Sequence, residues 1–307
     1  MVLSGLTQAQ DPSNQLTAQV SAQLVVIIDD IGNSYPLGNA MVELDAPLTL
    51  AFLPHTPHAK TLANKANLLH KDVILHAPME NTVKAALGPG ALTKALTETE
   101  FKLTLKKAIA SIPHVQGINN HMGSELTQNK QSMQWVMETL KGEDLFFVDS
   151  LTSPKSVAYQ QAVKYQLPAL RRHIFLDNDK SSQALTKQWN KAIRIAHKTG
   201  RAILIGHPYQ ESHAFLAQQI PKLAAQNVKV ISASELLLQQ AWKGFEQSAI
   251  QDNKANRYLL HNTLDTNING TSINDTSISD TSISDTSISN THINDMLISQ
   301  SSINSSH

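Results

Sequence analysis

Short apolar runs followed by polar residues recur along the first 245 residues of the chain. The run at 24–28 (LVVII) is rich in β-branched residues and ends at Asp29 and Asp30, as is typical of a strand that is buried on both faces. Runs of the same kind occur at 48–53, 72–75, 117–118, 145–148, 202–205 and 228–231. The pattern therefore predicts about seven short parallel strands.

Segments with helical periodicity separate these strands, at 99–112, 130–140, 181–199 and 211–226. The alternation of strands and helices predicts a parallel sheet, either as a closed or nearly closed barrel or as an open doubly wound sheet. In both architectures the carboxyl ends of the strands build the active site. Six polar residues are expected there: Asp29, Asp30, His76, His121, Asp149 and His207.

The two ends of the chain differ in composition from this region, so the barrel domain is assigned to residues 23–245. Residues 1–22 are interpreted as a leader, either the remnant of a signal peptide or a plain disordered leader, since they lack a basic start and a full apolar stretch. A five-residue unit with one isoleucine recurs from Thr266. The tail, 246–307, is expected to be disordered because it has few apolar residues, although a pentapeptide β-helix would show a similar repeat.

Charge and composition exclude several classes of protein. The 25 basic and 25 acidic residues balance, which argues against a general nucleic-acid binder. The chain has no cysteine, so thiol catalysis and cysteine metal sites are excluded and the 13 histidines become the candidate nitrogen ligands for a metal. No run of 18 apolar residues occurs, and no membrane span is predicted.

The adjacent carboxylates of Asp29 and Asp30 follow a buried strand, where an ionised group is costly unless a cation or hydrogen bonds satisfy it. Successive residues point in different directions, so one carboxylate can bind a metal while the other faces the substrate as a base. The alternative is that the pair caps the following turn.

Histidines mark the ends of two further strands. His76 begins the segment HAPME, in which Glu80 lies four residues later, and this spacing can converge on one metal from a loop; the alternative is a hydrogen-bonded core histidine. The segment GINNHMGS at 117–124 contains His121. Its polar neighbours are expected to orient ligands or to bind substrate, because amides are costly to order at a barrel mouth. These neighbours are Asn119, Asn120 and Ser124.

His207 lies in a Gly-His-Pro turn that would hold its imidazole rigidly as a general acid. Asp149 and Asp177 are typical of carboxylates that orient a histidine behind such a site, or alternatively of helix N-caps. The basic segment 171–173 (RRH) could contact an acidic group of a substrate or pair with those carboxylates.

Six motifs in order resemble the divergent polysaccharide deacetylase family, bacterial relatives of the chitin and peptidoglycan deacetylases. They are IIDDIG at 27–32, LHAPME at 75–80, GINNHMGS at 117–124, VDS at 148–150, RRHIFLDN at 171–178 and GHP at 206–208. The resemblance spans residues 24–238. It implies a deformed (β/α)7 barrel of the glycoside hydrolase/deacetylase type, which agrees with the strand count.

The resemblance also implies roles for individual residues. Asp29 would be the catalytic base, and His207 the general acid. Asp30 and His76 would bind the metal, but Glu80 stands where the better-known enzymes have a second histidine. His121 lies where those enzymes have an Arg-x-Pro-Tyr element, and we expect it to supply the missing ligand.

The implied activity is that of a metal-dependent hydrolase acting on carbon–nitrogen bonds other than peptide bonds. It would remove acetyl groups from a cell-envelope polysaccharide or peptidoglycan-like polymer with metal-activated water, in the periplasm or outside the cell. Two imidazoles and one carboxylate with an open position favour Zn²⁺. The alternative is a non-catalytic envelope barrel that keeps the metal site to bind glycan or protein, as the two missing elements suggest. A hydrolase of another amide or ester is a third possibility.

Overall fold

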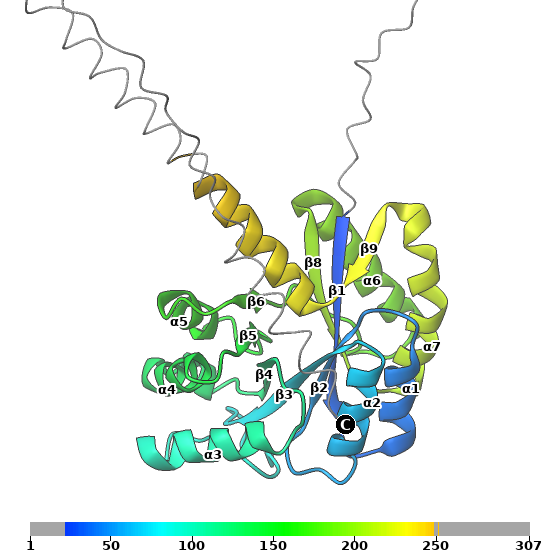
Figure 1. The fold of residues 1–307 in the computed structure, drawn as a ribbon. Coiled ribbons are helices and arrows are strands. Elements are labelled where there is room, and N and C mark those ends of the chain that lie inside the picture. Colours follow the sequence, from blue (N-terminus) through cyan, green and yellow to red (C-terminus); the bar gives the residue numbers. More distant parts are fainter. Residues whose placement is uncertain (1–21, 249–250, 252–307) are drawn as a thin grey trace, which may run out of the picture. The chain divides into compact units, whose positions relative to one another are not determined.

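A computed structural model describes residues 22–248 and residue 251 of the chain (Figure 1). The predicted leader therefore lies outside the described residues apart from Ala22. The predicted repeat tail also lies outside them, apart from 246–248 and 251. In the described part, no helix has the length and apolar character needed to cross a membrane.

Nine parallel strands form one sheet in the described part of the chain. Its order is β6-β5-β4-β3-β2-β1-β8-β7, and β9 pairs with the first residues of β1. The strands are β1 (Ala22–Ile31), β2 (Thr49–Phe52), β3 (Asp72–Met79), β4 (Gly117–Met122), β5 (Phe146–Asp149), β6 (Ala169–Arg171), β7 (Ile174–Phe175), β8 (Arg201–Gly206) and β9 (Val228–Ile231).

The two edges of this sheet are joined by a single chain segment. Only Arg172 and His173 separate β6 from β7. The Arg172 N–H donates to the carbonyl of Asp149 on β5 (3.0 Å), and the His173 N–H donates to the carbonyl of Ile203 on β8 (2.9 Å). The segment thus changes its partner from β5 to β8, and the sheet curls until its edges meet.

The predicted deformed seven-stranded barrel is confirmed when β6 and β7 are counted as one interrupted strand. The membership of the ring differs from the prediction, because the run at 228–231 forms β9, which lies off the ring. The segment 169–175 takes its place. No continuous apolar run predicted a strand in this segment. Its strand residues are only the three of β6 and the two of β7, on either side of the change of partner.

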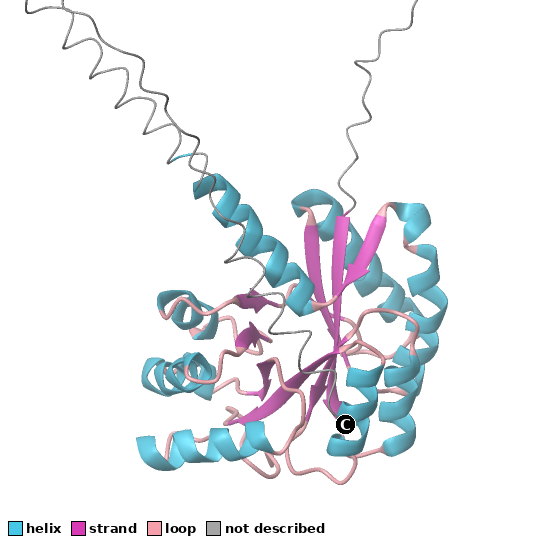
Figure 2. Ribbon diagram, in the orientation of Figure 1, coloured by secondary structure: helices cyan, strands magenta, loops and turns pink. Residues whose placement is uncertain are grey.

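Helices cover the outside of the sheet (Figure 2). They are α1 (Tyr35–Glu43), α2 (Ala59–Leu68), α3 (Glu98–Ala110), α4 (Lys130–Lys141), α5 (Ala158–Lys164), α6 (Ser182–Thr199) and α7 (Gln210–Gln219), followed by a helix at 233–248. The four predicted helices are present, but α7 ends at Gln219 because Pro221 cannot continue the helix, and two 3₁₀ turns follow. Helices α1, α2 and α5 and the helix at 233–248 were not predicted.

The side chains of each strand divide between two cores. Leu24, Val26 and Ile28 pack outward against the helices, whereas Val25 and Ile27 fill the barrel interior. The helix at 233–248, the unlabelled orange helix in Figure 1, adds Ala233 and Leu236 to the interior core. It therefore closes the barrel at the amino ends of the strands, opposite the end where the predicted site lies.

Asp72, at the start of β3, attaches this closing helix. Its carboxylate accepts hydrogen bonds from the backbone N–H and the hydroxyl of Ser234 (2.8 and 2.7 Å) and from the hydroxyl of Thr49 (3.2 Å). A buried carboxylate at a helix N-terminus satisfies donors that would otherwise lack partners.

We expect Asp72→Ala to lower the free energy of unfolding by about 2–3 kcal/mol, because it leaves these donors unsatisfied in the interior. Urea denaturation followed by circular dichroism measures the change. Glu211→Ala, at an exposed carboxylate of α7, is the matched control and should change the stability by less than about 0.5 kcal/mol. Equal effects of the two substitutions would contradict the capping role of Asp72.

Candidate metal centre and active site

A β-bulge at the end of β1 directs both adjacent carboxylates into the barrel. The register with β2 runs from Ile28↔Leu50 to Ile31↔Phe52, so β1 has one residue more than its partner over this stretch. Asp30 adopts a left-handed conformation with φ 58°, which aspartate tolerates better than most residues. A bulge turns a side chain that would otherwise point to the opposite face.

Three possible metal-ligand atoms form a triangle, one each from Asp30, His76 and His121. The Asp30 Oδ1 lies 3.2 Å from His76 Nε2 and 3.0 Å from His121 Nδ1, and the two ring nitrogens are 3.1 Å apart. His76 lies opposite Asn119 on β4, and His121 is two residues further along. Both imidazoles therefore face the barrel interior.

This triangle fits a divalent cation. Ligands at 2.0–2.1 Å from a tetrahedral metal are separated from one another by about 3.3 Å, close to the three distances here. Asp30 Oδ1 is buried and has no hydrogen-bond partner of good geometry. Burial opposes the ionisation of Asp30, but the neighbouring His121 and His76 imidazoles hold its pKa well below the usual range, so the carboxylate is ionised, as a metal ligand must be.

The Asn119 side chain connects the histidine and the second carboxylate. Its Oδ1 lies 2.7 Å from His76 Nδ1, and its Nδ2 donates to Asp29 Oδ1 (2.7 Å). Because an amide oxygen only accepts, the network places the hydrogen of His76 on Nδ1 and leaves the lone pair of Nε2 facing Asp30. Such a contact suits the first of the two roles expected for these amides, orienting a ligand or binding substrate.

Asp29 is buried behind the triangle, with a carboxylate oxygen 3.7 Å from His76 Nε2. Burial raises the pKa of Asp29, and the nearby His76, His207 and Asn119 offset this only in part. A carboxylate with a raised pKa is a stronger base than an ordinary aspartate. Asp29 and Asp30 thus have opposite electrostatic environments one residue apart.

His207 faces the site from the end of β8, and Asp177 orients its ring. The Asp177 carboxylate accepts from His207 Nδ1 (2.8 Å), from the His207 N–H (2.7 Å) and from the Ser212 hydroxyl (2.6 Å). Burial lowers the pKa of His207, but the hydrogen bond to Asp177 and the charges of Asp29, Asp177 and Asp30 raise it to about 9. The imidazole is therefore protonated at neutral pH, as a general acid requires.

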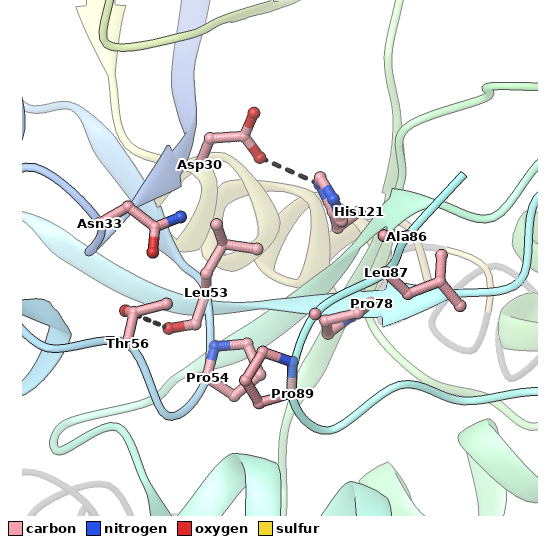
Figure 3. A pocket seen from close by; sticks show the side chains of 11 residues that line it. Asp30, Asn33, Leu53, Pro54, Thr56, Pro78, Ala86, Leu87, Pro89 and His121 are labelled. Atoms are coloured by element: carbon pink, nitrogen blue, oxygen red, sulfur yellow. Dashed lines mark hydrogen bonds and ion pairs between the residues drawn. The ribbon is translucent and has the colours of Figure 1, made fainter.

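A pocket of about 410 Å³ opens beside Asp30 and His121 (Figure 3). Its walls come from the loops that follow β1, β2 and β3 and are mainly apolar. The lining residues besides the candidate ligands Asp30 and His121 are Asn33, Leu53, Pro54, Thr56, Pro78, Ala86, Leu87, Gly88 and Pro89. Sequence reasoning missed these residues, and only the Gly-Pro composition of the 86–90 loop could have marked that segment.

Four predicted site residues lie away from the metal triangle, and the first two are Asp149 and Glu80. Asp149 does not orient a histidine: its carboxylate accepts from the Leu151 N–H (2.8 Å) and the Ser156 hydroxyl (3.0 Å), so it shapes the loop after β5. Glu80 does not reach the metal triangle, because its carboxylate accepts from Lys84 Nζ (2.8 Å) and from the backbone N–H of Lys94 (3.0 Å).

Asn120 and Ser124 contact loops rather than the centre. Asn120 donates to the carbonyl of Met122 (2.7 Å) and accepts from the Ser150 N–H (2.9 Å). The Ser124 hydroxyl accepts from the Thr82 N–H (3.1 Å). Asn120 thus joins the end of β4 to the loop after β5, and Ser124 joins the loops after β3 and β4.

Comparison with known proteins identifies relatives of this chain. The sequence model of the divergent polysaccharide deacetylase family matches residues 26–237. The uncharacterized protein YibQ of Escherichia coli (strain K12) is 32% identical over 218 residues, which cover 71% of this chain and 68% of that protein. An uncharacterized protein of Haemophilus influenzae is 32% identical over 195 residues, which cover 64% of this chain and 70% of that protein.

A solved structure shares the fold. The uncharacterized protein ATU2773 from Agrobacterium tumefaciens C58 superposes with a TM-score of 0.67 at 19% sequence identity. The superposition covers 70% of this chain and 89% of that one. At this identity the likeness concerns the fold alone.

We expect Asp177→Asn to lower the pKa of His207 from about 9 toward its ordinary value of 6.5, because the amide keeps a hydrogen-bond acceptor but removes the charge. NMR titration of the His207 ring, assigned with His207→Gln, measures the pKa. Glu80→Gln, at a carboxylate outside the site, should leave it unchanged. A His207 pKa that stays near 9 in Asp177→Asn would show that Asp177 does not control it.

Proposed function

The chain belongs to the divergent polysaccharide deacetylase family, and from this premise we propose that it is a metal-dependent hydrolase that removes acetyl groups from a cell-envelope polysaccharide. The observation that carries the proposal is the triangle of Asp30, His76 and His121 between a buried aspartate and a protonated histidine. Metal-assisted amide hydrolysis combines a base, an acid and a Lewis acid around one water and one carbonyl.

The chain's own residues supply the proton transfers. A bound divalent cation would supply Lewis-acid activation of the attacking water and of the acyl carbonyl. Asp29 accepts the proton that the water loses as it attacks the carbonyl carbon. His207 donates its proton to the amide nitrogen as the carbon–nitrogen bond breaks, and acetate and a free amine result. Asn119 and Asp177 hold these two groups in place.

The donor set and the pocket support the choice of ion and substrate. Two imidazoles, one carboxylate and an open position favour zinc. The pocket walls carry no charged side chain other than the candidate ligands Asp30 and His121, so they suit a neutral acetamido group better than an anion. An envelope polysaccharide as substrate would place the protein in the periplasm or outside the cell.

The second candidate is a barrel that binds an envelope glycan or a protein without turnover. It is favoured by Glu80, which stands at the position of the second histidine of better-known deacetylases and pairs with Lys84 instead. Binding of an acetylated glycan without release of acetate, unchanged by Asp29→Asn, would support this candidate over the first.

Purified protein is expected to contain about one zinc per chain, and His76→Ala and His121→Ala should each lose most of it, because two remaining ligands bind zinc weakly. Elemental analysis of the full chain measures the metal. Glu80→Gln is the matched control and should retain the metal, since its carboxylate lies outside the triangle. Metal-free protein after reconstitution with zinc would eliminate the hydrolase mechanism.

Deacetylation should depend on both proton-transfer groups. We expect Asp29→Asn to lower kcat/KM for an acetylated chitooligosaccharide by at least about 100-fold, the usual contribution of a general base. For the wild type, kcat/KM should fall above pH 9 as His207 loses its proton. It should also fall at acidic pH as Asp29 gains one, with a midpoint above the ordinary aspartate value of 3.8.

Acetate release at several pH values measures this profile. Asp45→Asn, at an exposed carboxylate away from the pocket, is the control for loss of an aspartate charge. Full activity of Asp29→Asn, or an alkaline limb that is unchanged in Asp177→Asn, would contradict the assigned roles.

A further inference from the structure

A second pocket lies at the seam where the barrel closes, between β6, the start of β8, α5 and the helix at 233–248. Its volume is about 230 Å³, and it shares no lining residue with the pocket beside the metal triangle. Most of its polar lining is cationic or can donate hydrogen bonds. The residues that matter for the argument are Arg171, Arg172, His173, Arg201 and Gln240.

Positive charge in this pocket is poorly balanced. Among the described residues, Asp149 is the one carboxylate within 4 Å of these arginines, and its Oδ2 lies 3.7 Å from Arg171 Nε, beyond hydrogen-bond distance. The Arg172 guanidinium donates to the neutral carbonyls of Ser150 and Leu151 (2.6 and 2.7 Å). This guanidinium lies over the Phe175 ring, 3.7 Å from its centroid, so Arg171 and Arg201 supply the positive charge that remains for a ligand.

Two buried donors in the pocket have no partner within the described part of the protein. They are Arg171 Nε and Gln240 Nε2. Buried donors are almost always paired, and leaving one unpaired costs free energy. Both side chains line the same pocket, so a ligand there would lie beside two side chains whose hydrogen-bonding capacity is not fully used.

His173 adds a third hydrogen-bond donor, and the pKa of its ring depends on the positive charge around the pocket. Its Nδ1 accepts from the Ile203 N–H (3.0 Å), which leaves the ring hydrogen on Nε2. Burial lowers the pKa of His173, and the charges of Arg201 and Arg172 lower it further. The lowered pKa beside Arg201 and Arg172 indicates a site that repels cations.

We propose that this seam pocket, defined by Arg171, Arg172, His173, Arg201 and Gln240, binds an oxyanion such as a phosphate or a carboxylate group. The planar fork of arginine matches the oxygens of both groups, and charge-assisted hydrogen bonds are the stronger kind. The site goes beyond the proposed hydrolase: it lies at the seam and shares no lining residue with the pocket beside the metal triangle.

Isothermal titration of the full chain with sodium phosphate and, separately, with sodium acetate tests the site, with ionic strength held constant by chloride. We expect saturable binding of at least one anion. Arg201→Gln and Gln240→Leu should each weaken it by about tenfold or more, as expected for the loss of a hydrogen bond to a charged group. Arg194→Gln, at an exposed arginine of α6 outside the pocket, should not.

The same titrations in a His121→Ala background distinguish binding in the seam pocket from binding at the metal site, because both anions can also bind a metal. In His121→Ala, which disrupts the metal triangle, binding should persist and should still be weakened by Arg201→Gln. Phosphate binding alone would identify a phosphoryl group, acetate binding alone a carboxylate, and either result supports the site. No saturable binding, binding lost with His121→Ala, or equal weakening by Arg194→Gln would overturn the proposal.

Discussion

The hydrogen bonds of the buried Asn119 amide are the interaction on which the candidate site depends. One end of the amide accepts from His76 and the other donates to Asp29, so a single side chain sets the tautomer of a candidate ligand and the position of the candidate base. Both partners are buried, and a buried carboxylate or imidazole without such a partner would lose its hydration without compensation. The neutral amide satisfies both without adding a charge.

The environment separates the two adjacent aspartates into different chemical roles. Burial raises the pKa of Asp29, whereas the two histidines hold that of Asp30 low. A pair of carboxylates with opposite shifts is the usual arrangement of a base beside a permanently charged ligand. The β-bulge makes this possible, because without it Asp30 would point toward the helices while Asp29 faced the barrel interior.

The change of strand partner at residues 169–175 accounts for two features of the molecule. It closes the sheet into a barrel, so that β1, β3, β4 and β8 direct their polar residues to one centre. It also interrupts the regular sheet at the seam, where residues 171–173 would otherwise continue one strand. The same irregularity therefore brings the catalytic candidates together and leaves a cationic pocket on another part of the surface.

The sequence by itself predicted seven of the nine strands and four of the eight α-helices in the described part of the chain, because apolar runs and the polar residues that end them are local signals. The grouping of Asp30, His76 and His121 was expected from the resemblance to the family. Only the tertiary structure decided which polar side chains face the centre. Asp149 and Asn120 follow the outward alternation of their strands, and Glu80 reaches lysines of its own loop, so none of them joins the site. Side-chain direction depends on register, on the bulge and on barrel closure, which are set by contacts between residues far apart in the chain.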